Sequence, residues 1–255
     1  MTESASIDAI LPAALAGLDD DAVAAHYSAG TSPTWLRANF VESVDGAATE
    51  KGLSGELGDA ADRRVFGILR RLCDVVLVGA GTVRAEGYGA MRVDDESASW
   101  RAAHGLAPQP TIAIVSGALD LDPRSSIFTE APVRPLVLTV ETSSAAARAT
   151  LGEVADVVVL GHDAVDAGAA ITELTGRGLG RILCEGGPTL FGSLLAANVV
   201  DELCVTLSPV LESGDARRIA RGPLSARVDL AIAGVLSSGS TLLLRYLRVD
   251  PADLE

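Results

Sequence analysis

Several features that define other classes of protein are missing from this chain of 255 residues. No apolar run reaches the length of a membrane span, and the N-terminus lacks the basic stretch and apolar core of a secretory leader. The three cysteines are an odd number without Cys-x-x-Cys spacing, a pattern that favours reduced, buried thiols. We therefore expect a cytoplasmic protein without a membrane partner.

Basic charge is also scarce, because 20 Lys and Arg stand against 34 Asp and Glu, for a formal net charge of −14 at pH 7. Such a charge repels nucleic acid, so we expect no nucleic-acid partner. An anionic substrate must instead be bound by local arginines and backbone N–H groups. His26, His104 and His162 lie far apart, and the motifs His-x-Glu and Pro-Cys-x-x-Cys are missing, so we expect no metal site.

Apolar runs of strand length alternate with segments of helical periodicity along most of the chain. This alternation predicts an α/β protein with a mostly parallel central sheet and helices on both faces. Residues 226–233 and 241–247, joined by a loop with Gly234 and Gly239, predict an antiparallel C-terminal hairpin. The expected strands are residues 35–41, 74–78, 110–116, 135–140, 156–160, 181–185 and 202–208, and the expected helices are residues 59–72, 143–151, 164–176 and 188–197.

Two glycine turns are the most informative feature of the sequence. They read Val78-Gly79-Ala80-Gly81-Thr82 and Cys184-Glu185-Gly186-Gly187-Pro188, and each links a strand-like run to a helical segment. Glycine lets the backbone approach a ligand closely, and a helix start offers unpaired N–H groups and a positive dipole end. Two such turns predict a diphosphate-bearing cofactor held from two sides. An acidic residue accompanies each turn, Glu86 the first and Glu185 the second.

The sequences around these turns occur in one order along the chain. Ser43-Val44-Asp45-Gly46 follows a strand, Leu69-Arg70 ends a helix, the two turns come next, and Val200-Asp201-Glu202-Leu203 follows them. Together they closely resemble the reductase half of the riboflavin-biosynthesis deaminase/reductase, a relative of dihydrofolate reductase that uses NADPH. The resemblance covers residues 34–247. The zinc-deaminase half is missing, so the chain resembles the stand-alone reductases of this family found in actinobacteria. The resemblance implies a dihydrofolate-reductase-like domain over residues 34–250, after an N-terminal extension with a short helix over residues 1–33.

The family's reaction opens the ribose of a 5-amino-6-ribosylamino-pyrimidine 5′-phosphate and delivers hydride to C1′, giving a ribityl chain. The resemblance therefore implies NADPH as cofactor, a small pyrimidine ribosyl phosphate as substrate, and a homodimer. It assigns the catalytic carboxylates to Glu86 and Glu185 and substrate binding to Arg70, Arg92 and Glu185. The matching cofactor-binding positions are Val41, Thr82, Glu86, Ser116, Gly187, Pro188, Thr189, Leu190 and Phe191, and the candidates for the 2′-phosphate are Arg84 and Arg124.

The segment after the first turn departs from the family pattern. The family has aspartate followed by Asp-Pro, whereas this chain reads Glu86-Gly87-Tyr88-Gly89 and is shorter by a residue, so Arg92 matches only across a gap. Residues 87–109 are expected to form a mobile loop. The substrate therefore stays open between a pyrimidine, which can be a diamino-pyrimidinone or an amino-uracil, and a pterin or dihydrofolate. A non-catalytic NADP(H)-binding protein is the third hypothesis.

Some of these residues also fit simpler roles when the sequence is taken alone. Arg70 is consistent with a solvated charge at a helix C-terminus, and Thr82 with a helix N-cap. The pair Asp201-Glu202 fits a strand entry or a dimer contact better than a catalytic pair. Because Glu185 ends a buried strand, its carboxylate is expected to be paired or functional.

Overall fold

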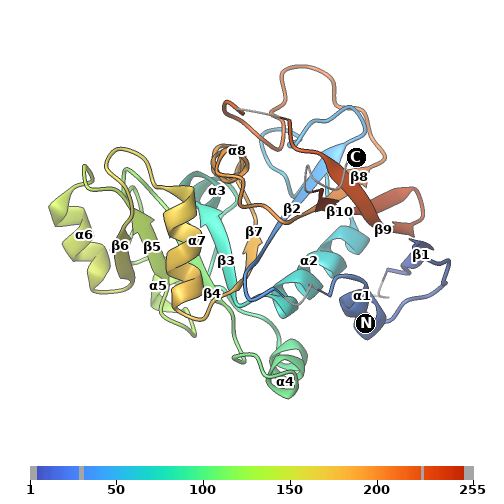
Figure 1. The fold of residues 1–255 in the computed structure, drawn as a ribbon, viewed down its shortest axis with the longest axis horizontal. Helices are drawn as coiled ribbons and strands as arrows, with labels where there is room; N and C mark the ends of the chain where they lie inside the picture. The colour runs from blue at the N-terminus through green and yellow to red at the C-terminus, as the bar shows by residue number, and fades with distance from the viewer. Residues whose placement is uncertain (1–4, 29–31, 225–226, 250–255) are drawn as a thin grey trace.

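A ten-stranded sheet runs through the computed structural model, which describes residues 5–28, 32–224 and 227–249 (Figure 1). The strand order is β1-β9-β10-β8-β2-β7-β3-β4-β5-β6. The seven strands from β8 to β6 in this order form a group in which all neighbouring strands are parallel. This confirms the predicted mostly parallel sheet. The seven strands are β2 (Trp35–Ser43), β3 (Val75–Gly79), β4 (Thr111–Val115), β5 (Leu136–Thr139), β6 (Asp156–Val159), β7 (Arg181–Cys184) and β8 (Glu202–Ser208).

The two faces of the sheet are buried beneath different helices. In β3, Val76 and Val78 join one apolar cluster and Val75 and Leu77 join the other, as the alternation of side chains along a strand requires. The first cluster includes the apolar face of α2, and the second includes those of α7 and α8. The helices are α1 (Asp20–His26), α2 (Ala60–Leu72), α3 (Ala80–Ala85), α4 (Asp95–Ala103), α5 (Ser126–Thr129), α6 (Ala145–Gly152), α7 (Ala167–Gly176) and α8 (Pro188–Ala196).

Three antiparallel strands complete one side of the sheet: β9 (Leu230–Ser238), β10 (Thr241–Arg248) and β1 (Asp8–Leu11). The predicted C-terminal hairpin is confirmed, although residue 226 lies outside the described residues. Its turn contains Gly239, but the placement of Gly234 in the loop was wrong, because Gly234 lies inside β9 opposite Arg245. A Cβ at Gly234 would lie 2.4 Å from the His26 ring, so the packing of α1 explains this glycine.

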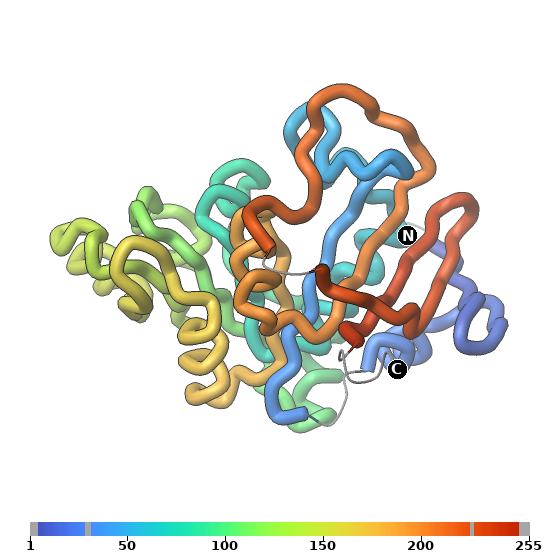
Figure 2. Tube along the Cα trace, turned by 45° about the horizontal axis from the view of Figure 1, so that its top comes forward, coloured from blue at the N-terminus to red at the C-terminus, as the bar shows by residue number. Residues whose placement is uncertain are grey.

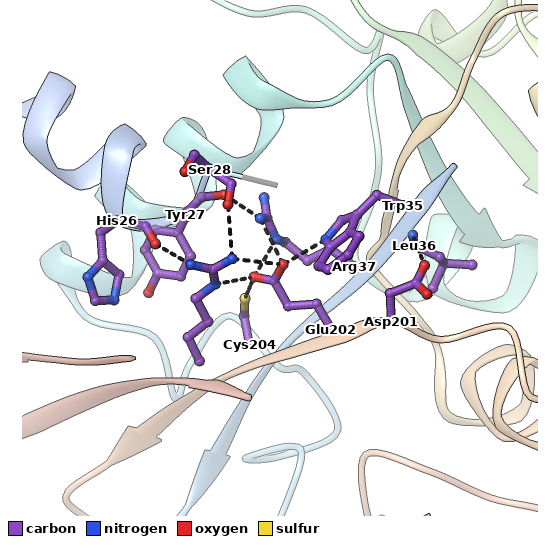
Figure 3. A network of polar contacts seen from close by, with 10 residues as sticks. His26, Tyr27, Ser28, Trp35, Leu36, Arg37, Asp201, Glu202 and Cys204 are labelled. Atoms are coloured by element: carbon purple, nitrogen blue, oxygen red, sulfur yellow. Dashed lines mark hydrogen bonds and ion pairs between the residues drawn. The ribbon is translucent and has the colours of Figure 1, made fainter. Parts of the chain in front are cut away.

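The N-terminal segment is packed onto the main sheet beside the C-terminal hairpin (Figure 2). Its α1 lies where the short helix is predicted. Behind α1, the buried carboxylate of Glu202 on β8 pairs with both Arg37 and Arg245 at 2.8 Å (Figure 3). The same two arginines donate hydrogen bonds to the last carbonyls of the α1 region. The division into an extension and a reductase domain remains a prediction.

The segment 87–109 is not the plain loop that the sequence suggested, because it contains α4. Asp94 caps this helix by accepting a hydrogen bond from the Ser97 N–H at 2.7 Å. The fully buried Arg101 donates to the carbonyls of Arg71 and Cys73 at the end of α2. Within the part of the chain that the structure describes, none of the helices is both long and apolar enough to cross a bilayer.

Candidate active site

The two glycine turns lie in direct contact at the carboxyl ends of neighbouring strands β3 and β7. The Gly79 N–H donates to the Gly186 carbonyl at 2.7 Å, and the Glu185 N–H donates to Leu77 at 3.0 Å. Because β3 and β7 are parallel neighbours, the helices that follow them, α3 and α8, begin at the same edge of the sheet (Figure 1). The pairing of the turns that the sequence suggested is therefore present in the fold.

The second turn leaves no space for side chains. Gly186 has φ +85°, and a Cβ there would lie 2.9 Å from the Phe40 ring. A Cβ at Gly187 would lie 2.6 Å from the Thr82 hydroxyl oxygen. Gly187 is also the N-cap of α8, and Pro188 occupies the first turn of that helix. The backbone of this turn is thus open to close approach by a ligand at a helix N-terminus.

A cleft of about 750 Å³ lies against these turns. Its glycine walls and the start of α8 fit a dinucleotide diphosphate, because they offer close backbone approach and a positive dipole end. The charged residues that line the cleft are of both signs, with Lys51 and Arg217 against Glu86, Glu212 and Asp215. Of the predicted cofactor residues, the cleft is lined by Thr82, Glu86, Gly187, Pro188, Thr189 and Leu190.

Two loops that cover the cleft are tied together by Asp45. Its carboxylate accepts hydrogen bonds from the Glu212 and Ser213 N–H groups at 3.1 and 2.7 Å. These bonds and, above all, the hydrogen bond from the Ser43 hydroxyl lower the pKa of Asp45 to about 2. A backbone bond from the Ala48 N–H to Arg217 at 2.7 Å adds a second tie. The loop after β2 and the loop after β8 therefore form one unit over the cleft.

A second cavity, of about 390 Å³, meets the cleft at Thr82 and Glu86, which line both. The predicted residues Val41, Arg70 and Glu185 line it as well. Glu86, at the junction, accepts hydrogen bonds from the N–H and the hydroxyl of Ser54, both at 2.9 Å. A cofactor in the cleft and a substrate in this cavity would therefore be neighbours. The remaining lining side chains include Asn39, Phe40, Asp62, Phe66, Tyr88 and Met91.

The predicted substrate residues Arg70 and Glu185 form a two-point ion pair. Arg70 Nε lies 2.7 Å from Glu185 Oε1, and Arg70 Nη2 lies 2.7 Å from Glu185 Oε2. The Glu185 side chain is only 1% exposed. The Tyr88 hydroxyl donates to the same carboxylate at 2.7 Å. Burial lowers and the Glu185 charge raises the pKa of Arg70, and the net effect is upward. Arg70 is therefore held in the cavity and is not a free charge at the helix end.

Tyr88 and Asp62 are cavity residues that the sequence interpretation missed. Burial, followed by the charge of Glu185, raises the pKa of Tyr88, and burial also raises the pKa of Asp62. Asp62, Phe66 and Arg70 follow one another at intervals of four residues, so they share one face of α2. That spacing is a sequence signal that would have placed Asp62 on the same face of the helix as the predicted Arg70.

Other predicted site residues lie away from both cavities. Arg92 is exposed, donates to the Glu130 carbonyl at 2.9 Å, and lines a separate hollow of about 310 Å³ that also contacts Arg70. Ser116 is buried, and its hydroxyl accepts a hydrogen bond from the Leu119 N–H at 3.0 Å. The side chain of Phe191 is buried and packs on Phe40, with ring centroids 4.7 Å apart. The roles given to these residues remain predictions.

The two candidate 2′-phosphate residues each lie beside an acidic neighbour. Arg84 Nε is 3.6 Å from Asp120, and Arg124 Nε is 3.3 Å from Asp122. Thr82 lies within α3, whose N-cap is Gly79, so its alternative role as an N-cap is wrong. Among the residues that the structure describes, no group of three or more His, Cys, Asp or Glu side chains is placed to hold a metal ion.

The chain belongs to the RibD C-terminal domain family, whose model matches residues 34–244. The predicted α/β class, with a mostly parallel sheet and an antiparallel C-terminal hairpin, is confirmed, and solved reductases of riboflavin biosynthesis share this fold. The structure of a pyrimidine reductase-like protein from Corynebacterium diphtheriae has a TM-score of 0.79 and 26% identity, and the match covers 85% of this chain and 92% of that one.

Two curated relatives illustrate the family. The 2,5-diamino-6-ribosylamino-4(3H)-pyrimidinone 5′-phosphate reductase of Methanothermobacter thermautotrophicus is 28% identical over 214 residues, which cover 82% of this chain and 95% of the relative. The riboflavin biosynthesis protein RibD of Mycobacterium tuberculosis is 25% identical over 207 residues, which cover 80% of this chain and 48% of the relative. This chain thus spans about half the length of that RibD protein.

Proposed function

We propose that this chain is an NADPH-dependent reductase that converts the ribosyl group of a 5-amino-6-ribosylamino-pyrimidine 5′-phosphate to a ribityl group. The observation that carries this proposal is the junction of a glycine-walled cleft with a polar cavity at Thr82 and Glu86. Membership of the RibD C-terminal domain family and the names of its relatives support it. When bound, NADPH supplies the hydride for the reduction.

The residues of the cleft bind and orient the cofactor. The backbone at Gly187 and the start of α8 hold the diphosphate, with Thr82 across from them. Val41 and Glu86 line the substrate cavity, and Glu86 lies at the junction, where the reacting end of the cofactor belongs.

The residues of the cavity bind the substrate and handle the proton that must accompany a hydride. Arg70 donates to acceptor atoms of the substrate and is fixed for this purpose by Glu185. Glu86 lies between the two cavities and is the predicted carboxylate for proton transfer during ring opening. Asp62, whose pKa is raised by burial, is a second carboxyl group in the same cavity that retains a proton to higher pH.

An assay of NADPH oxidation separates the three hypotheses. Purified protein is titrated with NADPH and then mixed with the pyrimidinone ribosyl phosphate or with dihydrofolate, while absorbance of the reduced nicotinamide is followed. Oxidation with the pyrimidine substrate, and formation of the ribityl product, support the proposal. Oxidation with dihydrofolate alone identifies a reductase of another heterocycle, and NADPH binding without turnover identifies a non-catalytic binding protein.

The cytoplasmic location remains a prediction. We also propose that the chain forms a homodimer. The apolar run 241–244 lies in β10, which is flanked by β8 and β9, so it does not form a free edge of the sheet. Support comes instead from β9, where Leu230 is 40% and Ile232 is 48% exposed on the outer hairpin. Sedimentation at micromolar concentration should give twice the monomer mass, and a monomer there would contradict the proposal.

A further inference from the structure

The Glu185 carboxylate has almost no acceptor capacity left for a substrate. Its side chain is 1% exposed, and its two oxygens accept three hydrogen bonds, two from Arg70 and one from Tyr88. The groups that meet a substrate at this end of the cavity are therefore the Arg70 guanidinium and the Tyr88 phenol. Glu185 holds both of them in place.

Tyr88 is positioned by its own backbone as well. Gly87, which follows the α3 C-cap residue Glu86, adopts φ +66°, and the Tyr88 N–H donates to the Val83 carbonyl at 3.0 Å. The Arg70 guanidinium lies 4.1 Å from the Phe66 ring centroid and 5.7 Å from that of Tyr88. The phenol is thus a fixed part of the cavity wall, in the segment where this chain departs from the family pattern.

The hydrogen-bonding character of the two groups is complementary. A phenol has one proton, and Tyr88 donates it to Glu185, so its oxygen can only accept from a substrate. Burial and the Glu185 charge raise the pKa of Tyr88, so the phenol keeps that proton at neutral pH. Arg70 can only donate. Because both groups bond to the same oxygen of Glu185, this acceptor and this donor lie side by side.

We propose that Tyr88 is a specificity-determining residue that selects a 2-amino-pyrimidinone over a uracil, a conclusion that rests on the proposed function. The phenol oxygen accepts an N–H from the C2 amino group, while Arg70 donates to an adjacent acceptor of the heterocycle. A uracil presents a carbonyl at C2, which would face the phenol lone pairs without a donor. Burying two acceptors against each other is unfavourable, so the uracil is discriminated against.

The test compares Tyr88→Phe with the unaltered protein on two substrates. These are 2,5-diamino-6-ribosylamino-4(3H)-pyrimidinone 5′-phosphate and 5-amino-6-(5-phosphoribosylamino)uracil. Phenylalanine keeps the ring and removes only the hydroxyl. We expect the KM for the diamino substrate to rise on the order of tenfold, as for one lost hydrogen bond, with little change in kcat. The preference for the diamino substrate over the uracil should fall by a similar factor, and the Kd of NADPH should not change.

Tyr246→Phe is the matched control, because Tyr246 lies on β10 outside both cavities. It should leave both KM values and the preference unchanged. If Tyr88→Phe keeps the full preference, or if the unaltered protein prefers the uracil, the role assigned to Tyr88 is wrong. Failure of the proposed function looks different, because the unaltered protein would then oxidise NADPH with neither substrate.

Discussion

The Glu185 carboxylate accepts hydrogen bonds from both Arg70 and Tyr88, each at 2.7 Å. An ionised carboxylate at the end of a buried strand is costly unless it is paired, so the sequence alone indicates that Glu185 has a partner. The partner comes from α2, more than a hundred residues earlier in the chain. Arg70 could be named from the family resemblance, whereas Tyr88 lies in the segment where this chain departs from the family pattern.

Gly187 provides a direct test of the cofactor cleft at the level of one residue. In Gly187→Ala, the new Cβ would lie 2.6 Å from the Thr82 hydroxyl oxygen, so Thr82 must shift at the mouth of the cleft. The Kd of NADPH should rise on the order of tenfold, since overpacking a tight contact costs about 1–3 kcal/mol. Titration of the nicotinamide fluorescence measures this Kd.

The control for this change is Gly176→Ala at the end of α7, where a Cβ meets nothing within 4 Å. It should leave the Kd of NADPH unchanged. Wild-type affinity in Gly187→Ala, with the fold intact by circular dichroism, would mean that the diphosphate is bound elsewhere.

At the scale of elements, Asp45 joins two loops that come from different strands. In Asp45→Asn, one carboxylate oxygen becomes an amide nitrogen, which cannot accept a hydrogen bond, so either the Glu212 N–H bond to Oδ1 or the Ser213 N–H bond to Oδ2 is lost. The loops over the cleft should loosen, so the Kd of NADPH should rise and protease cleavage within residues 209–217 should become faster. Asp122→Asn is the control, because Asp122 also has a lowered pKa in an exposed turn but lies outside the cleft.

The Asp45 tie also has a predicted pH range. Because its pKa is lowered from 3.8 to about 2, the charged form is favoured in the folded loops. The tie is fully present above the ordinary pKa and is lost as the pH falls toward 2. Protease cleavage of these loops should therefore accelerate below about pH 4 in the unaltered protein and depend less on pH in Asp45→Asn. Equal profiles in the two proteins would remove Asp45 from this role.

Elements with strong local signals were predictable from the sequence, and elements that depend on distant contacts were not. The apolar runs of β3 and β4 and the Asp59 cap of α2 are visible in the sequence, and all three are confirmed. The strand β1 is short and mostly exposed, so only its pairing with β9 defines it. The helix α4 does have a start signal in the sequence, since Asp94 is followed by two acidic residues. Its buried face carries Arg101 in place of an apolar residue, so the helical periodicity of apolar residues is weak there.

The same distinction applies to the candidate site. The glycine turns could be predicted because glycine and a helix start are local features with a local physical consequence. The meeting of the turns, and of the two cavities, depends on strand order, which the alternation of elements does not specify. The direction of the Tyr88 side chain depends on Glu185, a residue of another strand.

At the scale of the whole molecule, Glu202 connects the N-terminal segment with both halves of the sheet. Its carboxylate has no exposed surface and contacts Arg37 on β2, Arg245 on β10 and the Trp35 indole N–H (Figure 3). The two arginines in turn hold the carbonyls at the end of α1. Asp201, the neighbouring acidic residue, accepts the Leu36 N–H at 2.7 Å, which confirms the strand-entry role for this residue.

Glu202→Gln should therefore destabilise the whole fold. Removing the charge leaves the buried Arg37 and the partly buried Arg245 without their carboxylate, which costs about 3–5 kcal/mol of the free energy of unfolding. The matched control is Asp156→Asn, because Asp156 also contacts two arginines, Arg134 and Arg177, but its side chain is 46% exposed. Its loss should cost no more than about 1 kcal/mol. Urea unfolding followed by circular dichroism measures both values.

The role of Glu202 also predicts how the free energy of unfolding depends on pH in the acid range. Burial alone would raise the pKa of Glu202, but the charges and hydrogen bonds of Arg37 and Arg245 outweigh burial and lower it. The contribution of Glu202 is therefore fully present above its ordinary pKa of 4.5 and is lost as the pH falls through the lowered value. Glu202→Gln should be less stable at pH 7, and its stability should decrease less steeply below about pH 4.5 than that of the unaltered protein. If the two unfolding curves instead differ by a constant amount down to pH 2, the ionised carboxylate is not what holds the α1 end to the sheet.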